Sequence, residues 1–396
     1  MPAPRFLCGV NYWPRGKGMD LWKAFEPDEI ADDFQRLKRL QAHAISLPLV
    51  WEDFQPRQEV VSQVALRQLD AVFDLAKTFG LKVMPVLLAG HQSGVNWVPQ
   101  WALEDEEDPD DPLPRRVSVG MRTRRRMRDI YSDPGMLRAQ VMLVREVVAR
   151  YRTHPALWGW TVGSEVGRLV EPKSRDAFWL WNALIAGEVK RLDPRHHALF
   201  GMGAEDLLRD RIRPEDVSEP EDVVGVRCRE MGPDPQEVVF LASLAWHLSL
   251  RRVVVTEAGR PMAPPGADSR FETFYEGNHH RTGLLASESQ AAEYLTAVLT
   301  GLWRIGAAGA FVYCYADAEP GMFGRPPFDE RIVERTYGLI RADGSEKPAA
   351  EAFRAFARKR REVQVPDEEI FGGLTAPQYY QAPDEHFRAL LAEFTG

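Results

Sequence analysis

The chain has 396 residues, of which 44% are hydrophobic and 27% are charged, so it is neither a disordered nor a fibrous protein. The 50 Lys and Arg residues against 58 Asp and Glu residues give a net charge of −8. This balance disfavours nucleic-acid binding, which needs a basic surface. The 3 cysteines are too few and too scattered for a disulfide framework or a cysteine metal site.

Short apolar runs alternate with amphipathic stretches along the chain. The runs, rich in Val, Ile, Leu and Phe, predict strands buried on both faces. In chain order they cover residues 6–12, 44–50, 82–88, 157–162, 198–202, 223–227, 252–256 and 309–315. Helical periodicity covers 28–41, 62–79, 133–151, 174–192, 287–303 and 347–359, with a weaker signal over 204–220.

Helix boundaries are visible in two of these segments. Leu66, Leu69 and Val72 form one apolar stripe, and Gly80 is a natural stop for that helix. Ser132 or Asp133 can cap the helix that follows.

Eight strands alternating with helices predict a parallel sheet, and eight is the number that closes a (β/α)8 TIM barrel. A doubly wound open sheet is the alternative, but the sequence lacks the glycine-rich fingerprint of its nucleotide-binding members. We expect one α/β barrel domain over residues 1–360 with an enlarged loop after strand 3. Residues 361–396 are expected to form a C-terminal extension packed on the barrel or on a partner chain.

The enlarged loop, residues 103–132, has an acidic run (EDEEDPDDPLP) followed by a basic one (RRVSVGMRTRRRMRD). One interpretation is a solvated loop with self-complementary charge. The other is a lid over the face of the barrel where active sites lie.

No stretch of about 18 apolar residues is present, so no membrane span is expected. The first strand follows MPAPR directly, without the apolar core of a signal peptide, which favours a cytoplasmic location.

Catalytic residues of a barrel project from the carboxyl ends of its strands. Strand 4 is followed by Glu165, and strand 7 runs into Glu257. A buried glutamate is suited to act as a general acid, while a second carboxylate can stay ionised as a nucleophile or base. Glycoside hydrolysis uses such a pair, and aromatic rings near the same strand ends could stack on sugars.

Several strings at strand ends carry a family resemblance, over roughly residues 5–360. They are GVNYWPR, LVWEDFQP, LLAGHQSGVNW, LWGWTVGSE, VVVTEAG, YCYAD and YGLIRADGSEKPAAEAF. The chain resembles glycoside hydrolase family 5 and its clan A of retaining barrel enzymes, in particular bacterial proteins similar to endo-β-mannanases and β-mannosidases.

The resemblance implies that Glu165 is the acid/base and Glu257 the nucleophile, about 5 Å apart, which is the separation for retention of configuration. It implies hydrolysis of a small oligosaccharide or glycoside, with a β-mannoside favoured and a β-glucoside or β-galactoside possible. No cofactor and no metal are expected. The alternative is a carbohydrate-binding barrel with reduced or lost catalysis. From these motifs and their strand-end positions we predict that the substrate-binding residues are Trp13, Trp51, His91, Asn96, Trp97, Ser164, Arg227 and Tyr313.

Four positions depart from the family pattern. Ser164 stands where the family has an Asn that holds the sugar 2-hydroxyl, and Ser46 stands where an Arg supports the nucleophile. Strand 6 carries Arg227 in place of a neutral residue, and Tyr313 replaces the usual Trp platform.

Arg227 and Arg229 are two residues apart, so on a strand they point the same way while Cys228 points oppositely. They could support Glu257 in place of the missing arginine, or select an acidic sugar. The remaining interpretation places both in a loop, paired with solvent acids such as Glu230.

Overall fold

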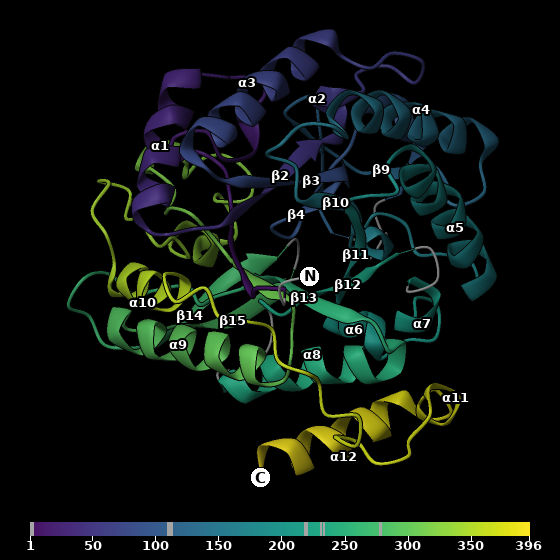
Figure 1. Cartoon of the computed structure of the whole chain (residues 1–396). Coiled ribbons are helices and arrows are strands. Elements are labelled where there is room, and N and C mark those ends of the chain that lie inside the picture. The colour runs from purple at the N-terminus through teal and green to yellow at the C-terminus, as the bar shows by residue number, and fades with distance from the viewer. Residues whose placement is uncertain (1–3, 109–113, 218–220, 230–231, 233, 277–278) are drawn as a thin grey trace.

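The computed structural model describes residues 4–108, 114–217, 221–229, 232, 234–276 and 279–396. Eight parallel strands close into a barrel in the order β1-β16-β13-β12-β11-β10-β3-β2 (Figure 1). The predicted single (β/α)8 barrel is therefore confirmed, and each strand overlaps an expected one. The barrel strands are β1 Leu7–Asn11, β2 Ala44–Val50, β3 Lys82–Ala89, β10 Gly159–Ser164, β11 His197–Gly203, β12 Val223–Arg227, β13 Arg252–Ala258 and β16 Gly309–Val312.

Six predicted helices surround the barrel close to their expected bounds. They are α1 Pro27–Arg39, α3 Gln63–Phe79, α4 Pro134–Tyr151, α5 Arg175–Leu192, α9 Glu288–Arg304 and α10 Pro348–Ala357. The cap of α4 is Asp133, whose carboxylate accepts from the backbone N–H groups of Gly135 and Met136. The weak helical signal over 204–220 corresponds to two short helices, α6 Ala204–Leu207 and α7 Pro214–Val217.

One barrel helix, α8 Pro235–Ser249, is absent from the predicted set. Its residues are apolar on nearly every side, so it lacks the polar face that marks an amphipathic helix. The reason lies in the C-terminal extension, where α11 (Ala376–Tyr379) is followed by α12 (Pro383–Thr395). The rings of Phe371, Phe387 and Phe394 pack edge-on against Phe240 of α8. Figure 1 shows α12 lying along the outside of α8.

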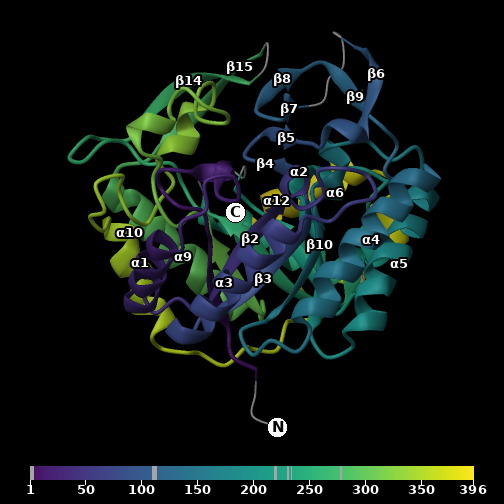
Figure 2. The same cartoon turned by 90° about the horizontal axis from the view of Figure 1, so that it is seen from above.

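The segment after β3 contains small sheets rather than a long irregular loop. Strands β4 (His91–Gln92), β5 (Val95–Trp97), β7 (Arg116–Ser118) and β8 (Met121–Thr123) form one sheet, while β6 (Leu103–Glu107) pairs with β9 (Arg125–Met127). Opposite charges within the segment meet, as between Arg125 and Asp105, 3.3 Å apart. Figure 2 shows β6 to β9 rising above the barrel opposite a second hairpin, β14 (Arg270–Glu276) and β15 (His279–Leu285).

Shorter helical elements complete the connections. They are η1 Gly18–Asp20, α2 Trp51–Phe54, η2 Gln100–Ala102, η3 Val166–Arg168, η4 Pro320–Met322 and η5 Ile332–Arg335.

The amino-terminal end of the barrel interior is filled by apolar side chains. They form one buried cluster from seven strands: Leu7, Ala44, Met84, Leu199, Val223, Val254 and Phe311. This packing leaves the opposite, carboxyl end of the strands as the place for polar groups. Within the described residues, no helix has the length and apolarity needed to cross a membrane.

Candidate active site

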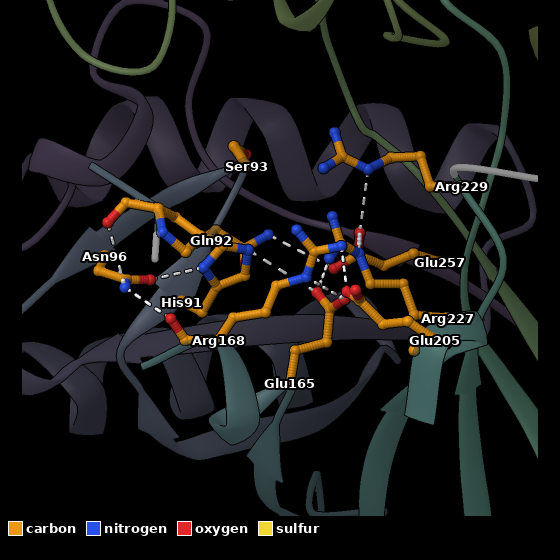
Figure 3. A network of polar contacts seen from close by, with 12 residues as sticks. His91, Gln92, Ser93, Asn96, Glu165, Arg168, Glu205, Arg227, Arg229 and Glu257 are labelled. Atoms are coloured by element: carbon orange, nitrogen blue, oxygen red, sulfur yellow. Dashed lines mark hydrogen bonds and ion pairs between the residues drawn. The ribbon is translucent and has the colours of Figure 1, made fainter. Parts of the chain in front are cut away.

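Two buried glutamates occupy the carboxyl end of the barrel. Glu165 follows β10 directly, and Glu257 is the sixth residue of β13. Only 5% of Glu165 and 6% of Glu257 is exposed. Their strands are separated by β11 and β12, so the two carboxylates approach each other across the barrel (Figure 3).

The backbone places Glu165 in an unusual conformation. Its φ is 47°, a left-handed value that is uncommon for a residue other than glycine. Its N–H donates to the carbonyl oxygen of Gly201 at 2.9 Å. A Cβ at Gly203 would lie 2.9 Å from Oε1 of Glu165, so only glycine leaves room for this carboxylate.

Three basic side chains surround the Glu165 carboxylate. Arg227 Nη1 forms an ion pair with Oε2, and Arg168 Nε lies 3.2 Å from Oε1. The His91 Nε2 atom lies 3.9 Å from Oε2. Arg168 also pairs with Glu205 of α6, which fixes its guanidinium beside the site.

Glu257 shares one of these partners. Arg227 Nε donates to its Oε2 at 2.8 Å, and Arg229 Nε lies 3.3 Å from the same oxygen. Gln92 Nε2 donates to Oε1 at 3.5 Å. Arg227 therefore contacts both catalytic candidates, and Arg229 contacts Glu257 alone among them (Figure 3).

Arg229 belongs to a second buried pair, with Glu334 of η5. Neither side chain is exposed to solvent, and the two form an ion pair. Burial alone would raise the pKa of the Glu334 carboxyl, but Arg229 and Arg331 hold that pKa below its ordinary value. Tyr313 donates to Glu334 Oε2 at 2.8 Å, and the Arg229 guanidinium lies 4.1 Å from the Tyr313 ring centre.

The predicted common orientation of Arg227 and Arg229 is present. Strand β12 ends at Arg227, but Arg229 is still directed at Glu257 and is only 2% exposed. The loop interpretation, with both side chains in solvent, is therefore wrong. Its named acid, Glu230, lies outside the described residues.

His91 and Asn96 form a support for the Glu165 side of the site. His91 Nδ1 lies 2.6 Å from Asn96 Oδ1, and Asn96 Nδ2 donates to the carbonyl oxygen of Arg168 at 2.8 Å. Asn96 has no exposed surface. In this structure it orients His91 and η3, and a substrate cannot reach it.

The predicted aromatic residues take different positions. Trp13 lines a cavity beside Glu257, as expected of a sugar-facing ring. Trp51 is not brought to the site: it lies in the main core, 1% exposed, with its indole N–H donated to Gln55. Trp97 is also in that core, and Tyr313 is 1% exposed, so neither presents a ring face to an open cavity.

The cavity beside Glu257 has a hydroxyl-rich lining. Ser46 and Ser164, the two positions where the family has larger residues, both border it. The buried hydroxyls of Thr161 and Thr256 border it as well and have no hydrogen-bond partner among the described residues. The lining is Asn11, Trp13, Ser46, Pro48, Met84, Val86, Gln92, Thr161, Ser164, Thr256 and Glu257. Small residues at 46 and 164 thus leave polar space near the nucleophile candidate.

Sequence reasoning missed three charged members of the site: Arg168, Glu205 and Glu334. Arg168 stands three residues after Glu165, and this short spacing was a usable signal. Glu334 offered none, because it follows β16 by 22 residues in a connection without regular periodicity.

Comparisons with known proteins found a partial family match and many structures with a similar fold. Residues 20–200 match the model of glycoside hydrolase family 42, described as β-galactosidase. This family and the predicted one are both in clan A. The chain therefore resembles clan A glycoside hydrolases in a family match over residues 20–200 and in its barrel fold. No curated protein matches it.

Solved glycosidase structures resemble the fold of this chain over most of its length. A GH5_18 protein from Streptomyces cattleya, in complex with Manb1-4GlcNAc, is 21% identical with a TM-score of 0.76, covering 98% of this chain and 91% of its own. The exo-beta-1,4-mannosidase Op5Man5 from Opitutaceae bacterium strain TAV5 is 22% identical with a TM-score of 0.72, covering 90% and 60%. A beta-galactosidase from Marinomonas ef1 is 14% identical with a TM-score of 0.63, covering 89% and 59%.

The chemistry of the site follows from its donors and acceptors. Within the described part of the chain, no group of three or more His, Cys, Asp or Glu residues could hold a metal ion. The catalytic candidates are instead two carboxylates held by guanidinium groups, which is suited to proton transfer and nucleophilic attack.

Proposed function

We propose that this protein hydrolyses a small β-mannoside by double displacement with retention of configuration. Glu165 protonates the leaving oxygen and later activates water, while Glu257 attacks the anomeric carbon. The observation that carries the proposal is the pairing of these two buried carboxylates around a single guanidinium, that of Arg227. One guanidinium can span them only if they are close together, as the retaining mechanism requires.

The charge of the site supports a neutral sugar. Four arginines meet four carboxylates there: Arg168, Arg227, Arg229 and Arg331 with Glu165, Glu205, Glu257 and Glu334. Each guanidinium is thus already opposed by a carboxylate, which leaves no excess positive charge for an acidic sugar. Of the two functional roles considered for Arg227, the support of Glu257 is the one that we adopt.

The choice of mannose rests on similarity to the GH5_18 protein in complex with Manb1-4GlcNAc and to the exo-beta-1,4-mannosidase. A β-glucoside and a β-galactoside remain the next candidates, the latter because of the family 42 match.

The test is hydrolysis of 4-nitrophenyl β-D-mannoside, β-D-glucoside and β-D-galactoside, followed by proton NMR within the first minutes. We expect the mannoside to be the best substrate and β-mannose to be the first product. Formation of α-mannose first would contradict the retaining mechanism. Binding of sugars without turnover of any glycoside would favour the alternative, a carbohydrate-binding barrel. The observation that supports this alternative is the position of Arg227 between the two carboxylates.

A further inference from the structure

Arg227 occupies the position that the reacting atoms need. In a double displacement the anomeric carbon and the glycosidic oxygen lie between the two carboxylates. Here the Arg227 guanidinium is paired with Glu165 through Nη1 and with Glu257 through Nε, the latter at 2.8 Å. Both carboxylates and the arginine are buried, with Arg227 only 4% exposed.

The cavity next to the site reaches only one of the two carboxylates. Its lining includes Glu257 and Ser164 but does not include Glu165. A sugar that enters there can approach Glu257 before it reaches Glu165, since Arg227 bridges from one carboxylate to the other (Figure 3).

We propose that Arg227 is a displaceable positioning residue: it closes the reaction centre in the free protein, leaves Glu165 when a sugar binds, and stays paired with Glu257. This inference rests on the proposed function. It adds two statements to that function: Arg227 closes the reaction centre of the sugar-free protein, and Arg227 has a different role toward each carboxylate.

The different needs of the two carboxylates explain why Glu165 is the one released. The general acid must carry a proton, and a neutral carboxyl has little attraction for a cation. The nucleophile must stay ionised, and a nearby guanidinium favours its charged form. Glu165 also keeps Arg168 and His91 close to it, so release by Arg227 does not leave it without polar neighbours.

The first experiment measures D-mannose binding by calorimetry, with D-glucose and D-galactose in parallel. In the wild type, binding must break the contact between Arg227 and Glu165, whereas Arg227→Ala has no such contact to break. We expect this variant to bind its preferred sugar about tenfold more tightly, the size of one charge-assisted hydrogen bond. Arg150→Ala is the matched control: Arg150 of α4 pairs with Asp70 of α3 outside the barrel, so its removal should leave sugar affinity within about twofold.

The second readout is the pH dependence of kcat/KM and the separation of kcat from KM on 4-nitrophenyl β-D-mannoside. Arg227→Ala should lower KM and lower kcat, because ground-state binding improves while Glu257 loses its partner. The basic limb of the profile should move to higher pH, since Glu165 loses a cation in the free protein; the charged groups around it are Arg227, Arg168, His91 and, through Arg168, Glu205. Arg227→Met repeats the test if the alanine variant does not fold.

The proposal fails if Arg227→Ala binds the sugars no more tightly than the wild type and Arg150→Ala, or if kcat falls while KM and the basic limb stay unchanged. Those results would show that Arg227 supports Glu257 without moving when a sugar binds. Because the binding arm needs no turnover, tighter binding in a protein that hydrolyses nothing would support the displacement of Arg227 and contradict the proposed function.

Discussion

The two ends of the barrel interior differ in what holds them together. At the amino-terminal end, side chains such as Phe311 and Leu199 are fully buried in an apolar cluster. At the carboxyl end, Glu165, Glu257 and Glu334 are just as inaccessible but are held by arginines. A buried charge destabilises the protein unless it is paired. Removing one member of a buried ion pair therefore destabilises the fold, because the other charge stays buried without a partner. Apolar packing therefore stabilises the amino-terminal end of the barrel, while the carboxyl end holds the charged groups proposed for catalysis.

The largest effect is expected from removing the nucleophile at the charged end. Glu257→Ala should lower activity on every glycoside on the order of 10⁴-fold or more, because no covalent intermediate can form. Glu165→Gln should nearly abolish activity on glycosides with poor leaving groups but keep part of it on an activated aryl glycoside, which needs less acid assistance. Steady-state kinetics on both substrate types will separate the two roles. Wild-type rates in Glu257→Ala would show that the nucleophile is misassigned.

At the apolar end, Phe311→Ala should reduce stability and leave the chemistry of the site in place. The ring packs closely over Gly9, where a Cβ would lie 2.3 Å from it, so its loss opens a cavity on the barrel axis. We expect a loss of about 3–5 kcal/mol in the free energy of unfolding, measured by urea denaturation. Phe271→Ala is the control, since that ring is 72% exposed and should contribute little. Equal effects of the two substitutions would contradict the assigned packing.

Asp206 is a partly buried carboxyl behind the site, and it tests how withdrawal from solvent affects stability. It accepts from the N–H of Gly203 at 2.8 Å, and burial raises its pKa from 3.8 to about 7. Between these two values the native state keeps a proton that the unfolded chain has lost, so Asp206 costs increasing stability as pH rises through this window. Asp206→Asn should therefore gain stability relative to the wild type by about 1 to 4 kcal/mol from pH 4 to 7, then level off. Parallel stability curves for the two proteins would exclude the raised pKa.

The smallest effect is expected at the tip of the β7–β8 hairpin, in the segment considered as a lid. Val119 and Met121 are 64% and 70% exposed, so shortening residues 119–122 to a two-residue turn removes little packing. The Val119 N–H donates to Glu52 at 2.7 Å, which connects the tip to α2. If the tip contacts substrate, KM should change severalfold while kcat and the melting temperature stay nearly constant. Unchanged KM on all substrates would favour a solvated loop.

Much of the fold could be predicted because barrel strands are buried on both faces and helices are amphipathic. The exception, α8, shows the limit: its outer face is covered by the C-terminal extension, so it has no polar stripe to detect. Prediction of position was most accurate at strand ends: Glu165 directly follows β10, and Glu257 lies near the end of β13. It was weakest for Trp51, which lies near a strand end but turns into the core, and for Glu334, which a long connection returns to the site.

The central claim is that Glu257 forms a covalent bond to the sugar, and the most direct test is an intact mass after incubation with 2-deoxy-2-fluoro-β-D-mannosyl fluoride. The fluorine slows hydrolysis of the intermediate, so we expect a mass increase of one fluorosugar and a digest peptide modified at Glu257. Glu257→Ala should show no adduct. An adduct on another carboxylate, or turnover of 4-nitrophenyl β-D-mannoside with inversion and no adduct, would contradict the role of Glu257 as the nucleophile.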